Sequence, residues 1–331
     1  MKHLAADVEL VQILRMPLVS IITPLLNKGS YVAETIRSLQ AQTKSDWEMI
    51  VVENGSTDNG PEQVRRLAGR DGRIKLTSSP KRGPGAARNF GLAQATGDWV
   101  LFLDADDLIY PDYLQTQLAV GLAHPAAQVV AGAWQVFEDA SPTTREIRRP
   151  AGWGQSSGVV IQTAIAFAPW ALHAAIVRRD WLEPHRRWHE TLDETPTEDT
   201  AFWFGVILDT VIAWSDCQSA CYRVNTANSR NAFLDGGRWF QAIVRVVETN
   251  LRTLQERGQE PSHAQCENIM RVFEEHYRGA IRRGDGALAV QTQEQARLWL
   301  QKCRTRSVAI AVRKLLGFGL TARLAGLRLA S

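Results

Sequence analysis

The sequence lacks any apolar run that approaches the roughly 20 residues needed to span a bilayer, so no transmembrane helix is expected. Cysteine is scarce: the four cysteines match no zinc-binding spacing, and the first residues do not form a secretory signal. These absences predict reduced thiols in a cytoplasmic protein. Low-complexity segments and internal repeats are also missing, so nothing indicates a repeat architecture.

Net charge is also small. The 38 lysines and arginines stand against 35 acidic residues, and the formal charge of +3 argues neither for nor against nucleic acid as a partner. What the chain does have is apolar residues, which make up 45% of its 331 residues and suit the core of one large domain or two modest ones. Charged residues at 22% suit a soluble protein.

An apolar run over residues 99–103 ends abruptly in the acids Asp104, Asp106 and Asp107. Burying unpaired carboxylates in an apolar setting would cost several kcal/mol, so these acids are expected at the carboxyl end of a buried strand. In open α/β sheets, ligands bind just outside the carboxyl ends of the strands. The stretch therefore predicts a metal-assisted site for a phosphorylated ligand.

Short apolar runs alternate with helical periodicities through the first third of the chain. Residues 18–22, 47–52, 74–76 and 99–103 are typical of buried strands. Between them, residues such as those of 32–39 place apolar side chains at helical spacing. The alternation of strand and helix predicts an α/β nucleotide-binding fold.

Polar segments follow these strands. Residues 53–58 follow the second strand, and Gly55 among them permits a turn with positive φ. Residues 81–89 combine two glycines with a lysine and the arginines Arg82 and Arg88, which suit close backbone approach and charge for a phosphate. Taken alone, this segment is also typical of an ordinary glycine-rich loop that leads into a helix.

In the second half of the chain, residues 128–137 are typical of another strand, and residues 139–157 of a loop that closes over the site. Glu198 and Asp199 precede an apolar helix over residues 200–208. Acids in a first helical turn stabilise the helix dipole, which is one explanation for them. The other is that the helix, apolar all round, is buried and directs both acids into a cleft.

The two ends of the chain differ from its centre. Met16 is a candidate for the true start, which would make residues 1–15 an extension. From residue 236 onward the chain is expected to be helical, and no acidic residue follows Glu294. Basic and apolar residues mix over residues 304–331, which suits an interfacial helix on anionic lipid and equally a solvated helix packed on the domain.

Five of these stretches, in their order and spacing, resemble the family 2 glycosyltransferases with a GT-A fold. They are residues 19–27, 52–58, 82–89, 104–107 and 197–199. The resemblance implies a GT-A, Rossmann-like α/β fold, with a mixed, mainly parallel sheet flanked by helices and a C-terminal helical extension.

The resemblance also implies the domain limits. After the extension over residues 1–15, we expect a glycosyltransferase domain over residues 16–232 and a helical C-terminal region over residues 233–331. Within the domain, residues 16–115 would bind the nucleotide sugar and residues 116–232 the acceptor.

By this resemblance the donor is a nucleotide-diphosphate sugar. Pro24, Asn27, Glu53 and Asn54 would hold the base and ribose at the ends of the first two strands. The chain departs from the family pattern at Leu26, where an aromatic residue usually stacks on the base, and at Glu53 and Asn54, where two aspartates are usual. Because the Asn54 amide both donates and accepts at a base edge, a UDP-sugar is still expected.

The acids would then bind ribose and metal. Asp104 and Asp106 would contact ribose or metal, and Asp106 or Asp107 would bind Mn²⁺ or Mg²⁺ on the diphosphate, since hard cations take oxygen ligands. Such a metal neutralises the leaving diphosphate. Arg82 and Arg88 are candidates for diphosphate contacts or for structural contacts.

Asp199 matches the general base of the family, which deprotonates an acceptor hydroxyl for in-line attack on the anomeric carbon and so inverts that centre. Glu198 would orient the acceptor or stabilise the start of the helix. His173 either lines the acceptor pocket or is a hydrogen-bonded, non-catalytic histidine. The Gln-x-x-Arg-Trp signature of processive relatives is absent, which favours the transfer of a single sugar.

The predicted function is therefore inverting, metal-dependent transfer of one sugar to a saccharide or lipid-linked acceptor in cell-surface polysaccharide synthesis. No nucleic-acid partner is expected, and residues 304–331 are a candidate for peripheral contact with the inner face of the membrane. One alternative is a sugar-phosphate nucleotidyltransferase, which usually carries a glycine-rich basic loop where this chain has residues 24–27. The other is a non-catalytic nucleotide-sugar-binding protein, against which the intact acids argue.

Overall fold

The computed structural model describes residues 19–139, 141–182, 186–226 and 236–303. The extension expected over residues 1–15, Met16 and the basic end over residues 304–331 lie outside the described residues. None of the described helices is long and apolar enough to cross a membrane.

The chain forms two compact units, each assembled from several stretches of sequence. The first takes residues 1–153, 170–190 and 210–228, and the second takes residues 154–169, 191–209 and 229–331. Two short stretches inside the expected catalytic domain thus belong with the helical region, and the expected domain limits stay a prediction.

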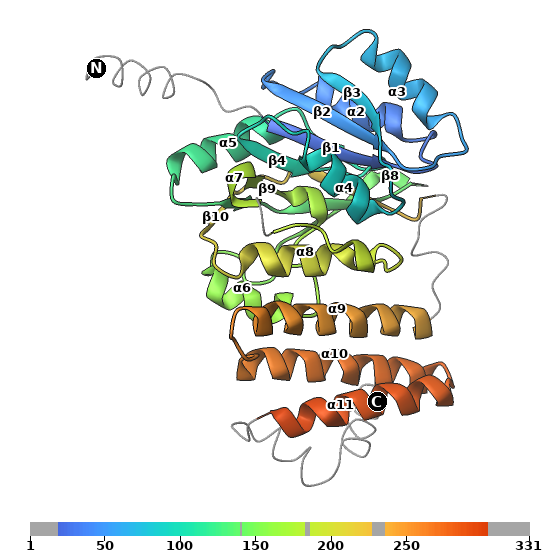
Figure 1. The fold of residues 1–331 in the computed structure, drawn as a ribbon, viewed down its shortest axis with the longest axis vertical. Coiled ribbons are helices and arrows are strands. Elements are labelled where there is room, and N and C mark those ends of the chain that lie inside the picture. Colours follow the sequence, from blue (N-terminus) through green and yellow to red (C-terminus); the bar gives the residue numbers. More distant parts are fainter. Residues whose placement is uncertain (1–18, 140, 183–185, 227–235, 304–331) are drawn as a thin grey trace, which may run out of the picture. The chain divides into compact units, whose positions relative to one another are not determined.

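A seven-stranded sheet forms the centre of the first unit (Figure 1). Its neighbouring strands are all parallel except β9, which runs antiparallel to both of its neighbours. In spatial order the strands are β10 (Ile212–Trp214), β6 (Val129–Ala131), β9 (Ala175–Arg178), β4 (Trp99–Phe102), β1 (Val19–Leu25), β2 (Trp47–Glu53) and β3 (Ile74–Ser78). The prediction of a mixed, mainly parallel sheet is confirmed.

Strand β1 continues past Ile22, where the run expected from the sequence ends, through Pro24 to Leu25. The carbonyl of Ile22 accepts a hydrogen bond from Leu103 N on the β4 side of the strand. Backbone groups two residues apart point to the same side, so the backbone nitrogen of Pro24 also faces β4. Pairing with β4 stops at Ile22, and the missing N–H of Pro24 therefore costs no ladder bond. The proline therefore does not end the strand, which continues to Leu25 at the carboxyl edge of the sheet.

The first unit also contains helices. They are α2 (Val32–Gln40), α3 (Gly60–Ala68), α4 (Pro84–Leu92), α5 (Tyr113–Ala123), the short α7 (Arg179–Leu182) and the 3-10 turn η1 (Leu172–Ala174). Helix α4 packs on β1 and β2, and α5 packs on β6 and β10. Gly91 brings α4 close to the sheet, since a Cβ there would lie 2.6 Å from Cγ2 of Ile22.

A second, four-stranded sheet in the same unit comprises β5 (Leu108–Ile109), β11 (Ala220–Val224), β7 (Trp134–Glu138) and β8 (Ser141–Arg148), in that order. The single strand expected over residues 128–137 is wrong, because β6 and β7 lie in different sheets. The break falls at Gly132, where a Cβ would lie 2.9 Å from the carbonyl oxygen of Cys217. The loop expected over residues 139–157 is wrong for residues 141–148, which form β8 and pair with β7, whereas residues 149–156 form neither helix nor strand.

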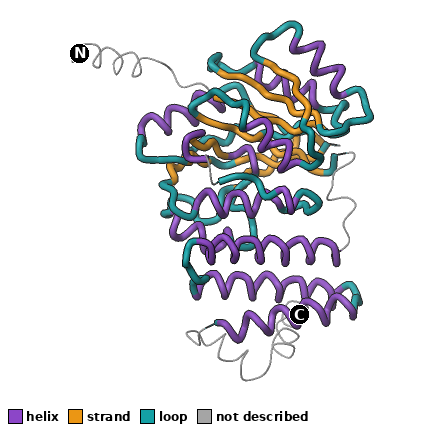
Figure 2. Tube along the Cα trace, viewed as in Figure 1, coloured by secondary structure: helices purple, strands orange, loops and turns teal. Residues whose placement is uncertain are grey.

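The described part of the second unit consists of helices and loops (Figure 2). Its helices are α6 (Ser157–Ala164), α8 (Glu198–Ile207), α9 (Gly236–Glu256), α10 (His263–Arg282) and α11 (Gly286–Lys302), and the short η2 (Glu190–Leu192) leads into it along the chain. Helix α8 is buried as its composition predicts, with Phe202, Trp203 and Phe204 inaccessible. Ser262 and Gln265 form a capping box that starts α10.

Candidate functional site

The polar segments that follow β1, β2 and β4 meet at one edge of the sheet, because β1 pairs in parallel with both β2 and β4. In open α/β sheets this carboxyl edge is where ligands bind. The structure thus brings together the strand-end residues expected to form the donor half of the site, Asn27, Glu53, Asn54, Asp104 and Asp106.

The turns after β1 and β2 are bonded into one structure. Asn27 has a positive φ of 51°, its side-chain oxygen accepts from Thr57 N at 2.8 Å, and its own N–H donates to Ser56 Oγ at 3.2 Å. Gly29 N donates to Asp58 Oδ2 at 2.7 Å. Asn27 is therefore a structural residue of the first turn in this conformation.

Glu53 stabilises the turn that follows β2. Its Oε1 accepts from Gly55 N at 2.6 Å and from Ser56 N. Burial alone would raise the pKa of Glu53, but these hydrogen bonds outweigh it and hold the pKa below its ordinary value. The carboxylate is thus ionised at neutral pH and occupied by the backbone of its own turn.

Asn54 ties the end of β2 to the glycine-rich segment before α4. Its Oδ1 accepts from Gly83 N at 2.7 Å, and its Nδ2 donates to the Lys81 carbonyl at 2.8 Å. The side chain is buried. Both ends of the amide, expected to read a base edge, therefore bind backbone in this structure.

Arg82 and Arg88 lie in different environments. Arg82 is exposed, and its guanidinium lies over Gly55, where a Cβ would be 2.9 Å from Cζ. Arg88 is buried, with its side chain 2% exposed, and its Nη2 donates to Asp104 Oδ1 at 2.7 Å. The Arg88 guanidinium also stacks on Trp188, 4.2 Å from the ring centre. Diphosphate contacts and structural contacts were the two roles expected for these arginines, and the contacts of Arg88 are structural.

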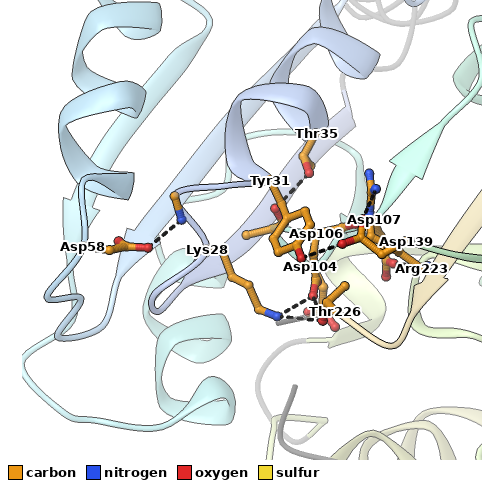
Figure 3. A network of polar contacts seen from close by, with 12 residues as sticks. Lys28, Tyr31, Thr35, Asp58, Asp104, Asp106, Asp107, Asp139, Arg223 and Thr226 are labelled. Carbon is orange, nitrogen blue, oxygen red and sulfur yellow. Dashed lines mark hydrogen bonds and ion pairs between the residues drawn. The ribbon is translucent and has the colours of Figure 1, made fainter. Parts of the chain in front are cut away.

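Asp106 pairs with Lys28 at the surface of the site (Figure 3). The ammonium Nζ of Lys28 lies 2.6 Å from Asp106 Oδ2, and both side chains are 15% exposed. Thr226 Oγ1 donates to the same carboxylate oxygen at 3.1 Å. Two oxygens from segments 120 residues apart therefore converge on one cation.

Asp107 faces the interior of the unit. Its Oδ1 accepts from Arg223 N at 2.8 Å, and its Oδ2 lies 3.2 Å from Nδ1 of His173, whose side chain is inaccessible. Burial raises the pKa of Asp107 to about 6, although His173 opposes the shift. Burial lowers the pKa of His173, but the Asp107 carboxylate overrides it and the net direction is upward. This geometry does not suit the metal-binding role expected of Asp107, and it fits the non-catalytic alternative for His173.

Arg223 organises the acids and is missing from the residues that sequence reasoning singled out. From β11, its Nε donates to the Asp106 carbonyl at 2.8 Å. Its Nη1 bonds Asp139 at 2.9 Å and its Nη2 bonds Glu34 at 2.6 Å. The sequence offered one signal for this residue: Arg223 is the only charged residue in the otherwise apolar run over residues 220–224.

The model of the family described as "Glycosyl transferase family 2" matches residues 20–185, about half of the chain. The chain belongs to this family. The resemblance inferred from the strand-end motifs is therefore confirmed.

Relatives in this family include an uncharacterized glycosyltransferase of Haemophilus influenzae, 42% identical over 32% of this chain and 42% of that protein. The putative teichuronic acid biosynthesis glycosyltransferase TuaG of Bacillus subtilis is 34% identical over 40% of this chain and 54% of its own length. The chain thus spans about half the length of these relatives. S. aureus TarS in complex with UDP has the same fold, with a TM-score of 0.58 and 22% identity over 77% of this chain and 71% of that chain.

Glu198 and Asp199, the acids expected on the acceptor side of the glycosyltransferase, belong to the second unit. They form the first turn of α8, with Glu198 buried and Asp199 half-buried. The base role of Asp199 stays a prediction, and the site described above is the one that the first unit builds by itself.

Among the described residues, no group of three or more histidine, cysteine or acidic side chains is arranged to hold a metal ion. The ligands that do converge on a cation are the oxygens of Asp106 and Thr226, around the Lys28 ammonium. Mg²⁺ is usually bound by one or two carboxylates together with substrate phosphates, so this pair of oxygens fits the protein's share of such a site.

Proposed function

We propose that this chain transfers one sugar from a nucleotide-diphosphate sugar to a hydroxyl of a saccharide or lipid-linked acceptor, in cell-surface polysaccharide synthesis. The observation that carries the proposal is the position of Asp104 and Asp106 at the carboxyl edge of the sheet in a family 2 domain. TuaG, a putative teichuronic acid biosynthesis glycosyltransferase, supports a polysaccharide product.

The donor is proposed to lie over the ends of β1 and β2, with UDP as the nucleotide. Support comes from the UDP bound to TarS, which has the same fold. Leu26 is 47% exposed at the end of β1, where it offers an apolar contact to the base in place of an aromatic ring. Arg82, exposed beside Gly55, supplies positive charge for the diphosphate.

Asp106 and Thr226 are the proposed protein ligands of Mn²⁺ or Mg²⁺, with phosphate oxygens completing the shell. When bound, the metal neutralises the negative charge that develops on the leaving diphosphate. Arg88 and Arg223 hold the segment around Asp106 through Asp104 Oδ1 and the Asp106 carbonyl. Both arginines therefore act on the position of the acids rather than on the donor.

Asp199 is proposed to take the proton of the acceptor hydroxyl. The hydroxyl oxygen then forms a bond to the anomeric carbon on the face opposite the diphosphate, and the bond to the diphosphate breaks with its electron pair. A single displacement of this kind inverts the anomeric centre. The position of Asp199 in the first turn of a buried helix, α8, supports a fixed orientation of its carboxylate.

The function is tested by incubating the full chain with a panel of nucleotide sugars, Mn²⁺ and oligosaccharide acceptors. We expect one donor to raise the melting temperature and to release nucleoside diphosphate only when an acceptor is present. Asp106→Asn should lose metal-dependent stabilisation by that donor. Asp46→Asn, which alters an exposed aspartate paired with Lys44, should keep it.

A panel in which no nucleotide sugar stabilises or reacts with the chain would contradict the proposal. Release of pyrophosphate from a nucleoside triphosphate and a sugar phosphate would instead support the nucleotidyltransferase alternative.

A further inference from the structure

Each carboxylate of the acidic motif is paired with a basic side chain of the chain itself. The pairs are Asp104 with Arg88, Asp106 with Lys28, and Asp107 with His173. The first and third basic side chains are 2% and 0% exposed, whereas Lys28 is 15% exposed. Of the three, only Lys28 is therefore open to exchange with a cation from solvent.

The ammonium of Lys28 takes the position that the oxygens around it offer to a cation. Its Nζ lies 2.6 Å from Asp106 Oδ2 and 3.1 Å from Thr226 Oγ1, and these two oxygens are themselves 3.1 Å apart (Figure 3). A divalent ion would need the same oxygens at shorter distances. Two cations sharing that space would repel each other strongly, so only one is held at a time.

We propose that Lys28 is the resident counter-cation of Asp106 and that a divalent metal binds Asp106 only by displacing it. The inference rests on the proposed function, because it takes Asp106 as the metal ligand of the donor site. Lys28 thereby sets the affinity of the site for the metal: the ion pair has to break before the metal–carboxylate bond forms.

Lys28 is suited to leave. Its charge is a single ammonium on a flexible four-carbon stem, and it lies close to the surface. Arg88 is held more firmly: its buried guanidinium lies 4.2 Å from the centre of the Trp188 ring, whereas the Lys28 ammonium lies 5.6 Å from the centre of the Tyr31 ring. Displacing Arg88 would leave buried charge unpaired, whereas displacing Lys28 returns one ammonium to water.

The test is the affinity of the full chain for Mn²⁺ without nucleotide, measured by calorimetry and by the EPR signal of free Mn²⁺. Lys28→Met removes the competing charge, and we expect it to bind Mn²⁺ about five- to tenfold more tightly than the wild type. Lys28→Arg retains the charge and should stay near the wild type. Lys28→Gln is measured alongside, so that the result does not depend on the folding of one variant.

Two controls give the result its meaning. Lys44→Met breaks a lysine–aspartate pair of 2.8 Å at a side chain that is 12% exposed, next to the start of β2, and should leave the Mn²⁺ affinity unchanged. Asp106→Asn should abolish Mn²⁺ binding with either Lys28 or methionine at position 28.

An Mn²⁺ affinity that is unchanged or weaker in both Lys28→Met and Lys28→Gln overturns the inference. So does a chain that binds neither Mn²⁺ nor Mg²⁺ with or without Lys28. UDP-sugar binding in EDTA then tests the donor site separately, because binding there would keep the proposed function while this inference fails.

Discussion

Glu48 shows how a single buried carboxylate is satisfied in the first unit. It lies in β2, away from the carboxyl edge, and its Oε1 accepts from Ser20 Oγ at 2.7 Å and from Thr96 N at 2.8 Å. Its Oε2 pairs with Lys75 Nζ at 2.8 Å. Burial by itself would raise the pKa of Glu48, but the hydrogen bonds and the Lys75 ammonium outweigh burial and lower the pKa to about 2. Folding therefore favours the ionised form.

This shift predicts how stability depends on pH. Because the folded pKa is depressed, the contribution of Glu48 is present above its ordinary pKa of 4.5 and is lost as pH falls toward about 2. We expect Glu48→Gln to lower the free energy of unfolding by about 2–3 kcal/mol at pH 7. Urea titrations between pH 7 and pH 3 should show the difference from the wild type shrinking as pH falls. A difference that is constant over this range would contradict the assignment.

Glu53 and Asn54 show what a sequence motif does not predict about individual side chains. Both residues were found from their positions after the second strand, yet each side chain binds backbone of the surrounding turns. The family motif identifies which residues gather at the edge of the sheet. The partners of each side chain depend on other segments, such as residues 81–83, which bind Asn54 and lie outside the motif after the second strand.

Among the elements, β11 connects the four-stranded sheet of the first unit to the acids that follow β4. It pairs with β5 and β7, and it projects Arg223 toward groups on three other segments. The bonds reach Glu34 on α2, Asp139 after β7 and the Asp106 carbonyl, and the guanidinium lies 4.7 Å from the centre of the Phe137 ring. The geometry uses the fork of donors that arginine has and lysine lacks.

Removing the Arg223 guanidinium is expected to destabilise the first unit. Arg223→Met removes the donors to Asp139 Oδ1 and to the Asp106 carbonyl, although Tyr31 still donates to Asp139 Oδ2, and we expect a loss of about 3 kcal/mol in the free energy of unfolding. Arg223→Lys should recover little of it. Arg148→Met, at an exposed arginine on β8 that pairs with Glu146, should change stability by less than about 0.5 kcal/mol. Equal effects of the two methionine variants in urea unfolding would show that Arg223 is not a structural clamp.

For the whole molecule, the strands β1 to β4 were predictable because parallel strands covered on both faces read as continuous apolar runs between turns. The same property hid the break at Gly132, since residues 128–137 stay apolar on both sides of it. At that break the carbonyl of Cys217, far along the sequence, lies close to Gly132, and no local pattern contains this contact.

The partners of the acids were not predictable for the same reason. Lys28 and Thr226 are 198 residues apart, and Asp107 and Arg223 are 116 apart. Motif spacing found Asp104, Asp106 and Asp107 as a group, but only the fold shows that Asp107 is buried while Asp106 remains at the surface.

The central claim, sugar transfer with Asp199 as the base, is tested most directly by the rate of transfer in Asp199→Asn. With the donor and acceptor identified for the wild type, we expect transfer to fall by about a hundred- to ten-thousandfold, since asparagine cannot accept the proton. Donor affinity should stay within about twofold. Asp209→Asn, at a half-exposed aspartate of the same unit paired with Arg257, should keep the wild-type rate. Transfer at the wild-type rate by Asp199→Asn would contradict the account.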